Sequence, residues 1–463
     1  MKKIIALCLL AALLISLGAC AKENAPKGMQ VGCARSSFTP DFPVEMPGFG
    51  NTFERISNGY LDPVCVTALV FQDVDGNSAI LLSVDLTEVE DTMTANVRKA
   101  VQEATGVPAE NIMLAATHDH SAPNYANPAV VSLISESAVE ASKEAMADMG
   151  VAEIYVGHAK TEGLNFVRHY VQDSGTYFGD NFGSASAGKI VSHTTEADRD
   201  APLIRFVREG KKDIIVMNFQ THPTMTSGPT RTNISADFIG SCRMEMEKRL
   251  DCHFMYFTGA AGNLNPNSRI EEENIHGKDW IDHGKALADY AIAALDNMEK
   301  VDGGKIQVLT TNYTGEVNHS DDDKADYVAI VQAAAKTGGN SYAQQIGPQY
   351  GIHSVYHANA IASRMRLGAT MDMKLSVLAV GDLAFVAAPY EMFDTNGMFI
   401  KENSPFKQTF IMECANDYYS YIPSAFGYEH GCYEADMTRF SPGTGEKLAD
   451  EFVSMLNQLN AGK

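Results

Sequence analysis

The chain has 463 residues, of which 45% are hydrophobic, and 58 acidic residues outnumber 36 basic ones to give a formal net charge of −22. This acidity disfavours nucleic acid and an anionic membrane surface as binding partners. Although a domain usually has ~100 to 200 residues, no linker, internal repeat or low-complexity segment divides the sequence. We therefore expect one large domain.

The N-terminal segment has the pattern of a secretory signal. Two lysines precede an apolar run from Ile4 to Leu17, which continues into Gly18, Ala19 and Cys20. This ending resembles a bacterial lipobox and predicts cleavage before Cys20 and acylation of its thiol. Because the apolar run is shorter than the ~20 residues that a bilayer requires, it is not expected to span a membrane.

These features predict a signal peptide at 1–20, a short tether at 21–30 and the folded domain at 31–463. The mature protein is expected to be an exported lipoprotein on the periplasmic side of a membrane, inner or outer, or at the cell surface. The alternative is an ordinary signal peptide in which Cys20 has no special role.

Short β-branched runs alternate with amphipathic stretches along the rest of the chain, which is typical of an α/β fold with a mostly buried sheet. In chain order, the sequence predicts strands at 64–72 and 79–84, a helix at 95–104, a strand at 112–116, a helix from about 136 to 149, a strand at 214–220, a helix at 236–249, a strand at 254–258, helices at 283–295, 327–335 and 357–367, a β run at 373–388 broken by the turn Gly381-Asp382, and a helix at 445–459.

The cysteines after Cys20 are scattered without the spacing of a metal site. They are Cys33, Cys65, Cys242, Cys252, Cys414 and Cys432. In an oxidising compartment Cys414 and Cys432 could form a disulfide. The alternative, that both are small buried apolar residues, is equally compatible with the sequence.

Polar residues follow three of the predicted strands directly. His118 and His120 come after the strand 112–116, His222 comes after 214–220, and a glycine-rich loop, 259–266, comes after 254–258. Because ligand sites of α/β sheets collect at the carboxyl ends of strands, one surface is expected to gather these loops.

The three histidines suggest a zinc site. Two residues separated by one point the same way at the end of an extended strand, so His118 and His120 are expected to face one pocket. His222 would add a third imidazole from another strand, and three imidazoles suit zinc. Taken singly, each histidine could instead be a hydrogen-bonded structural residue.

Collinear motifs along the chain resemble those of the neutral/alkaline, non-lysosomal ceramidase family, and the resemblance extends from Val31 to about Glu434. The segments that carry it are Val31-Gly32-Cys33-Ala34-Arg35, Thr39-Pro40, Asp62-Pro63, Ala68-Leu69-Val70, Ser83-Val84-Asp85-Leu86, Leu114-Ala115-Ala116-Thr117-His118-Asp119-His120-Ser121, Asn165 to Arg168, Thr221-His222-Pro223-Thr224, Gly262-Asn263-Leu264-Asn265-Pro266-Asn267, Ala388-Pro389-Tyr390-Glu391 and Asn416 to Ser424.

The resemblance implies a zinc site and places further residues beside it. The implied zinc ligands are His118, His222, Glu391 and Tyr421. The second histidine of the pair is His120, the pocket arginine is Arg168, and a second tyrosine, twelve residues after Tyr421, is Tyr433. Where the family has glycine in the tyrosine turn, this chain has Ser420.

These assignments imply a hydrolytic mechanism. Zinc lowers the pKa of bound water toward ~7, so that the water can attack a carbonyl at neutral pH. His120 and Tyr433 would then donate hydrogen bonds to the developing oxyanion, and Arg168 would orient a polar or charged group of the substrate. The alternatives are ordinary half-buried aromatics for Tyr421 and Tyr433 and a surface ion pair for Arg168.

Two departures from the family pattern bear on the substrate. Asn265 stands where the ceramidases have serine, and an amide there can still donate a hydrogen bond if water is the nucleophile. Only the predicted helix 445–459 follows the last site residue, so we expect a catalytic domain without the C-terminal β-sandwich of ceramidases.

The sequence thus predicts a single ceramidase-like zinc-hydrolase domain that cleaves an amide, or N-acyl, bond in a small acylated substrate other than ceramide. The first alternative is an esterase or deacetylase that acts on an acylated glycan. The second is a binding lipoprotein without catalytic activity, which would have no need of the complete set of site residues.

Overall fold

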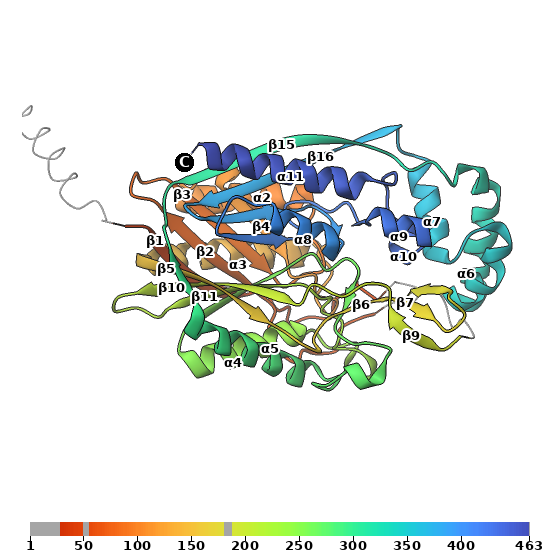
Figure 1. The fold of residues 1–463 in the computed structure, drawn as a ribbon, viewed down its shortest axis with the longest axis horizontal. Helices are drawn as coiled ribbons and strands as arrows, with labels where there is room; N and C mark the ends of the chain where they lie inside the picture. Colours follow the sequence, from red (N-terminus) through yellow and green to blue (C-terminus); the bar gives the residue numbers. More distant parts are fainter. Residues whose placement is uncertain (1–27, 50–54, 180–187, 463) are drawn as a thin grey trace, which may run out of the picture.

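The computed structural model describes residues 28–49, 55–179 and 188–462 (Figure 1). The predicted signal peptide, Cys20 and most of the tether lie outside these residues. No helix among the described residues is both long and apolar enough to cross a membrane.

A nine-stranded mixed sheet forms the centre of the molecule (Figure 1). Its order is β12-β11-β10-β5-β1-β2-β3-β4, and β14 pairs with β5. The pairs β3–β4 and β11–β12 are parallel and the other pairs are antiparallel. The strands are β1 (Gln30–Ser37), β2 (Cys65–Gln72), β3 (Ser78–Val84), β4 (Ile112–Ala116), β5 (Gly150–Lys160), β10 (Asp200–Arg208), β11 (Ile214–Phe219), β12 (His253–Thr258) and β14 (Glu299–Val301).

A second sheet packs against one face of the first. Its order is β15-β16-β17-β19, with β17 and β19 parallel, and its strands are β15 (Ile306–Glu316), β16 (Thr370–Val380), β17 (Leu383–Ala387) and β19 (Gln408–Met412). Phe71 of the first sheet and Phe385 of the second lie in the same buried cluster, with ring centroids 6.0 Å apart. Strands that lie between the two sheets and the covering layers have continuously apolar sequences, because both of their faces are covered.

Helices cover the outer faces of both sheets, so the layers run helix, sheet, sheet, helix. The first sheet carries α2 (Asp91–Thr105), α3 (Pro128–Ala147), α4 (Asp237–Leu250) and α5 (Trp280–Ala294), and the second carries α8 (Asp394–Glu402) and α11 (Thr444–Ala461). In Figure 1, α4 and α5 lie below the sheets and α11 above them. This architecture confirms the predicted α/β class.

A helical insertion joins β15 to β16. The two strands pair from Ile306↔Val380 to Glu316↔Thr370, so the ends of the insertion, residues 317–369, are held together. It contains α6 (Ala325–Ile346) and α7 (Val355–Arg364), which share a small apolar cluster of their own. Helix α6 is broken at Gly338 and Gly339, where the φ of Gly339 is 71°.

Two expectations about local structure need correction or completion. Helix α3 begins at Pro128 rather than at about residue 136, because Asn127 caps it by accepting a hydrogen bond from the backbone N–H of Ala129.

All six cysteines at 33, 65, 242, 252, 414 and 432 are buried and none is in a disulfide, so Cys414 and Cys432 are not paired.

His283 on α5 makes the stability of the fold sensitive to acid. It is buried against Phe238, and neither ring nitrogen has a hydrogen-bond partner among the described residues. Burial lowers its pKa to about 3. The unfolded chain therefore binds a proton below pH ~6.5 that the folded chain does not bind, and stability falls as the pH falls toward 3.

Replacing His283 with leucine is expected to remove this part of the acid sensitivity. Between pH 7.5 and pH 5, the free energy of unfolding of the wild type should fall by about 2 kcal/mol more than that of His283→Leu. Urea unfolding of both proteins at the two pH values measures the difference. Parallel losses in the two proteins would show that His283 does not titrate in this way.

Candidate metal centre and active site

The histidine pair lies in the loop that follows β4. His118 has a φ of 62°, so this residue is in the left-handed region and not at an extended strand end as the sequence predicted. The two imidazoles nevertheless meet, with their Nε2 atoms 3.2 Å apart. The strained backbone at His118, rather than strand alternation, brings them together.

Backbone carbonyls fix the orientation of two histidines. His118 Nδ1 lies 2.7 Å from the oxygen of Thr87, and His222, after β11, has its Nδ1 3.0 Å from the oxygen of Leu264. Because a carbonyl oxygen only accepts, both Nδ1 atoms carry a proton, and Nε2 is the nitrogen of each ring that can present a lone pair to a metal. This is the arrangement typical of metal-ligating histidines.

Glu391 and Tyr421 are held side by side by a short parallel bridge. The strands β18 (Glu391–Met392) and β20 (Tyr421–Ile422) pair with Glu391 opposite Tyr421. Ser420 precedes the bridge with a φ of 65°, a conformation that glycine adopts without steric cost, and its oxygen accepts from the Glu391 N–H. Tyr418 donates a hydrogen bond of 2.5 Å to Glu391 Oε1, which leaves Oε2 to face the histidines.

The four predicted ligands converge on one point. Glu391 Oε2 lies 3.2 Å from Nε2 of His118 and 3.2 Å from Nε2 of His222, and the Tyr421 hydroxyl lies 3.4 Å from His222 Nε2. Glu391 Oε2 has no hydrogen-bond partner among the described residues although both imidazoles are this close. Two ligands of one tetrahedral zinc ion, each ~2.0–2.1 Å from the metal, stand about 3.3 Å apart. The donor set therefore fits zinc.

The cluster contains one buried carboxylate, that of Glu391, whose charge a cation would stabilise. Burial would raise the pKa of Glu391, but His118 and His222 hold it well below its ordinary value, so the carboxylate is ionised. Burial and Arg168 lower the pKa of His222 to about 4 and keep it neutral. Burial also opposes charge on His118, but Glu391 raises its pKa to about 9, and a metal bound at Nε2 would displace this proton. A metal binds carboxylates and imidazoles in their deprotonated states.

Arg168 is buried in the wall of the site and is not part of a surface ion pair. It follows β6 (Phe166–Val167), which pairs with β13 (Leu264–Asn265). Its Nε donates to Glu434 Oε1 at 2.6 Å, its Nη2 donates to the Gly262 oxygen at 2.9 Å, and its Nη1 lies 3.5 Å from Asn265 Oδ1. Burial alone would lower the pKa of Arg168, but Glu434 raises it well above its ordinary value.

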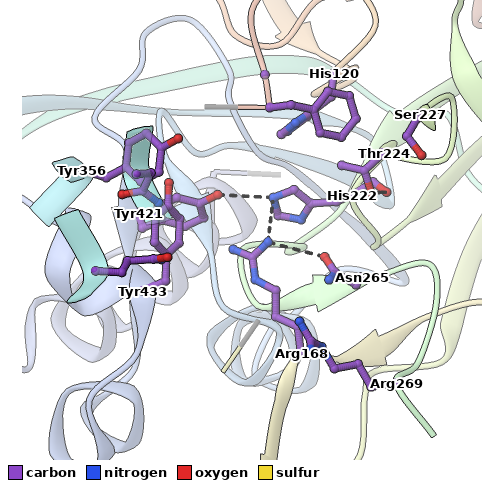
Figure 2. Close-up of a pocket in the computed structure, with 14 residues that line it drawn as sticks. His120, Arg168, His222, Thr224, Ser227, Asn265, Arg269, Tyr356, Tyr421 and Tyr433 are labelled. Carbon is purple, nitrogen blue, oxygen red and sulfur yellow. Dashed lines mark hydrogen bonds between the residues drawn. The ribbon is translucent and has the colours of Figure 1, made fainter. Parts of the chain in front are cut away.

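A cavity of about 560 Å³ opens beside the four ligands (Figure 2). Six of the predicted site residues line it, while His118 and Glu391 lie buried behind the wall. The lining residues are Gly48, Phe49, His120, Arg168, His222, Thr224, Ser227, Asn265, Arg269, Asn340, Gln344, Tyr356, Tyr421 and Tyr433. In Figure 2 the three tyrosines gather on one side of the cavity and His120 stands on the other. The structure thus brings all the predicted residues of the folded domain to one site.

The helix α10 (Tyr433–Met437) presents Tyr433 to the cavity from its first residue. The Tyr433 ring lies 5.7 Å from that of Tyr421 and 6.4 Å from that of Tyr356 on α7. Burial raises the pKa of Tyr433 above its ordinary value, so its hydroxyl keeps its proton and can donate a hydrogen bond.

Sequence reasoning missed several residues that support the site. Tyr418 orients Glu391, and Glu434 bridges Arg168 and His169, whose Nε2 lies 2.9 Å from Glu434 Oε2. Glu434 directly follows Tyr433, and Tyr418 lies close to Tyr421 in the sequence. A single carboxylate or a further tyrosine at such a position forms no motif that would have predicted its role. Gln344 and Tyr356 come from the helical insertion, which shows no motif at all.

Two other groups of potential metal ligands occur among the described residues. They are His169, Cys432 and Glu434, and His353, His357 and Asp436. In the first, Glu434 is already neutralised by Arg168. In the second, the nearby Asp321 is paired with Arg364 and Lys324, so the group belongs to a network of ion pairs. Neither matches the converging donors around Glu391.

Glu434→Gln is expected to leave the buried Arg168 without its counter-charge. The free energy of unfolding should fall by about 3 kcal/mol, because breaking a buried ion pair strands the remaining charge. The double variant Arg168→Met/Glu434→Gln should recover part of this loss. Denaturant unfolding of the three proteins tests this, and a loss below about 1 kcal/mol in the single variant would contradict it.

Comparisons with known proteins give a consistent picture. A family model described as neutral/alkaline non-lysosomal ceramidase, N-terminal, matches residues 29–263. The fold is similar to the crystal structure of neutral ceramidase from Pseudomonas aeruginosa, with a TM-score of 0.70 and 17% identity over 93% of this chain and 74% of that chain. It is equally similar to a ceramidase complexed with C2, with a TM-score of 0.70 and 16% identity over 94% of this chain and 75% of that one. No curated protein matches the sequence.

Proposed function

Since the chain belongs to the neutral/alkaline non-lysosomal ceramidase family, a family of hydrolases, we propose that it is a zinc-dependent hydrolase of amide, or N-acyl, bonds. The observation that carries this proposal is the convergence of His118, His222, Glu391 and Tyr421, with Glu391 Oε2 3.2 Å from both imidazoles. Those four residues would hold the ion. When bound, zinc supplies Lewis acidity and lowers the pKa of the water that it coordinates toward ~7.

The side chains of the cavity wall would bind and orient the substrate carbonyl. His120 and Tyr433 stand on opposite sides of the cavity, from which they would donate to the oxygen on which negative charge develops. Burial and His118 lower the pKa of His120 well below its ordinary value, so it donates as a neutral imidazole. Arg168, which is fixed by Glu434, lies beside Asn265 in the cavity wall, where both would orient polar groups of the substrate.

The metal ligands are held ready by contacts that the chain itself provides. Carbonyls of Thr87 and Leu264 fix the histidine tautomers, and Tyr418 fixes Glu391. Gly262 lets the following loop pack on the ligand strand, because a Cβ at this position would lie 2.9 Å from the oxygen of Glu391. Such preorganisation lowers the barrier because the dipoles need not reorganise during the reaction.

Two alternatives remain within the same site. An esterase or deacetylase that acts on an acylated glycan would use the same residues, because esters and amides pass through the same kind of oxyanion. A binding lipoprotein without catalysis would not need zinc. Hydrolysis of a panel of N-acyl and O-acyl compounds by the zinc-loaded protein tests the proposal. Amide cleavage that chelation abolishes supports it, and a zinc-replete protein that cleaves no compound contradicts it.

We further propose that Cys20 is lipidated and tethers the protein to a membrane. Cys20→Ala is expected to move the protein from the detergent phase to the aqueous phase, because acyl chains, and not the acidic body, would provide membrane affinity. Phase partitioning of extracts from expressing bacterial cells measures this. Unchanged partitioning of the variant would contradict the lipobox interpretation.

A further inference from the structure

The helical insertion 317–369 supplies one wall of the cavity. Its helices α6 and α7 lie at the same end of the molecule as α10, which carries Tyr433 (Figure 1). Asn340, Gln344 and Tyr356 of the insertion line the cavity. The insertion packs around its own apolar cluster, which includes Val331, so its cavity face is free to carry polar side chains.

The break in α6 places the polar side chains at the cavity. Asn340 directly follows Gly339, and its Oδ1 accepts a hydrogen bond of 3.0 Å from the N–H of Val355 at the start of α7. This bond ties the last turns of α6 to α7. Gln344, one turn further, is half-buried at the cavity, and its side chain makes no hydrogen bond to another residue in the part of the chain that the structure describes.

The cavity lining, as far as the structure describes it, is suited to a substrate that forms hydrogen bonds. Apart from Gly48 and Phe49, every residue that lines the cavity has a side chain that donates or accepts hydrogen bonds. An alkyl chain that filled this space would take the Gln344 amide, and whatever hydrogen-bonding capacity the other side chains have left, out of water without replacing it. A hydroxyl-rich molecule would satisfy these groups, and the rings of Phe49 and Tyr356 would cover its apolar faces.

We propose that the insertion selects an acylated, hydroxyl-rich substrate, a small acylated carbohydrate, with Gln344 as a specificity-determining residue. This inference rests on the proposed hydrolase function and names its substrate class. A cavity of about 560 Å³ is of the size that holds a small molecule. Long-chain ceramide, with two alkyl chains and few hydroxyls, is then a poor substrate.

A matched pair of variants tests the role of Gln344. Gln344→Leu replaces the amide with an apolar group of similar size, and Gln345→Leu makes the same change at the exposed neighbouring position outside the cavity. For zinc-loaded protein, kcat/KM is compared on N- and O-acetylated mono- and disaccharides and on acetylated cyclohexylamine and cyclohexanol. Gln344→Leu should lose about tenfold on the preferred saccharide, as expected for one neutral hydrogen bond, and less than twofold on the cyclohexyl compounds. Gln345→Leu should match the wild type on both.

Calorimetric binding of the same saccharides separates this inference from the proposed hydrolase function. Saccharide binding that Gln344→Leu weakens, without hydrolysis of any compound, would support the inference and contradict the hydrolase function. Hydrolysis that favours the cyclohexyl compounds or ceramide would overturn the inference and leave the hydrolase function standing. The inference would also be overturned if Gln344→Leu lowered kcat/KM equally on the saccharides and the cyclohexyl compounds, or lowered it on neither. It would likewise be overturned if no saccharide of the panel bound or reacted.

Discussion

His222→Ala is expected to release the zinc ion and abolish hydrolysis. His222 Nε2 is 3.2 Å from Glu391 Oε2 and 3.4 Å from the Tyr421 hydroxyl, so the variant removes a nitrogen that lies beside two of the other proposed ligands. Loss of a group that merely supports a ligand costs 10–100-fold in metal affinity. We therefore expect affinity for zinc to fall by at least about 100-fold when a ligand itself is removed.

The zinc content after dialysis and a zinc titration measure this loss of affinity. Two further variants serve as comparisons. Tyr418→Phe, which removes the hydrogen bond to Glu391 Oε1, should weaken zinc binding by about 10-fold. His158→Ala, at an exposed histidine paired with Asp200, should change nothing. Stoichiometric, tightly bound zinc in His222→Ala would refute the ligand assignment.

Tyr433→Phe is expected to lower kcat by about 10²–10³-fold while the protein keeps its zinc. The ring packs against Tyr421 and Tyr356 and stays in place, so only the hydroxyl that would donate to the developing oxyanion is lost. KM should change little, because the interaction is made mainly in the transition state.

Steady-state kinetics on the best substrate of the acyl panel measure this loss, with Tyr419→Phe as the control. Tyr419 lies outside the cavity, where its hydroxyl donates to the oxygen of Asp372 at 3.0 Å. The control should keep full activity. A Tyr433→Phe variant with undiminished kcat would show that this tyrosine only shapes the wall.

Most of the strands that the sequence predicted are covered on both faces, although the largely buried strands β10 and β19 were not predicted. Runs such as 64–72 and 112–116 consist almost wholly of apolar residues because helices cover one face and the second sheet the other. Strand β5 was not predicted either, since exposed residues such as Glu153, His158 and Lys160 occur near both of its ends. Its place in the sheet depends on β10, which pairs with it along its length and which is far away in the sequence.

Strand ends predicted the three histidines His118, His120 and His222, and the family resemblance selected the proposed ligands among them and added the other two. His118 and His222 come directly after predicted strands, where ligand sites collect. Glu391 and Tyr421 are brought to them by a bridge of two residues on each strand, which is too short to leave a pattern. The positions of Glu434 and Gln344 at the site could not be predicted, because they depend on how α10 and the insertion pack against the cavity.

The most direct test of the zinc site is anomalous diffraction from crystals of the purified protein at wavelengths on either side of the zinc absorption edge. We predict a single strong peak, present only above the edge, within about 2.0–2.2 Å of Nε2 of His118, Nε2 of His222 and Oε2 of Glu391. A peak at another place in the zinc-replete protein, or no peak between these three atoms, would contradict the account.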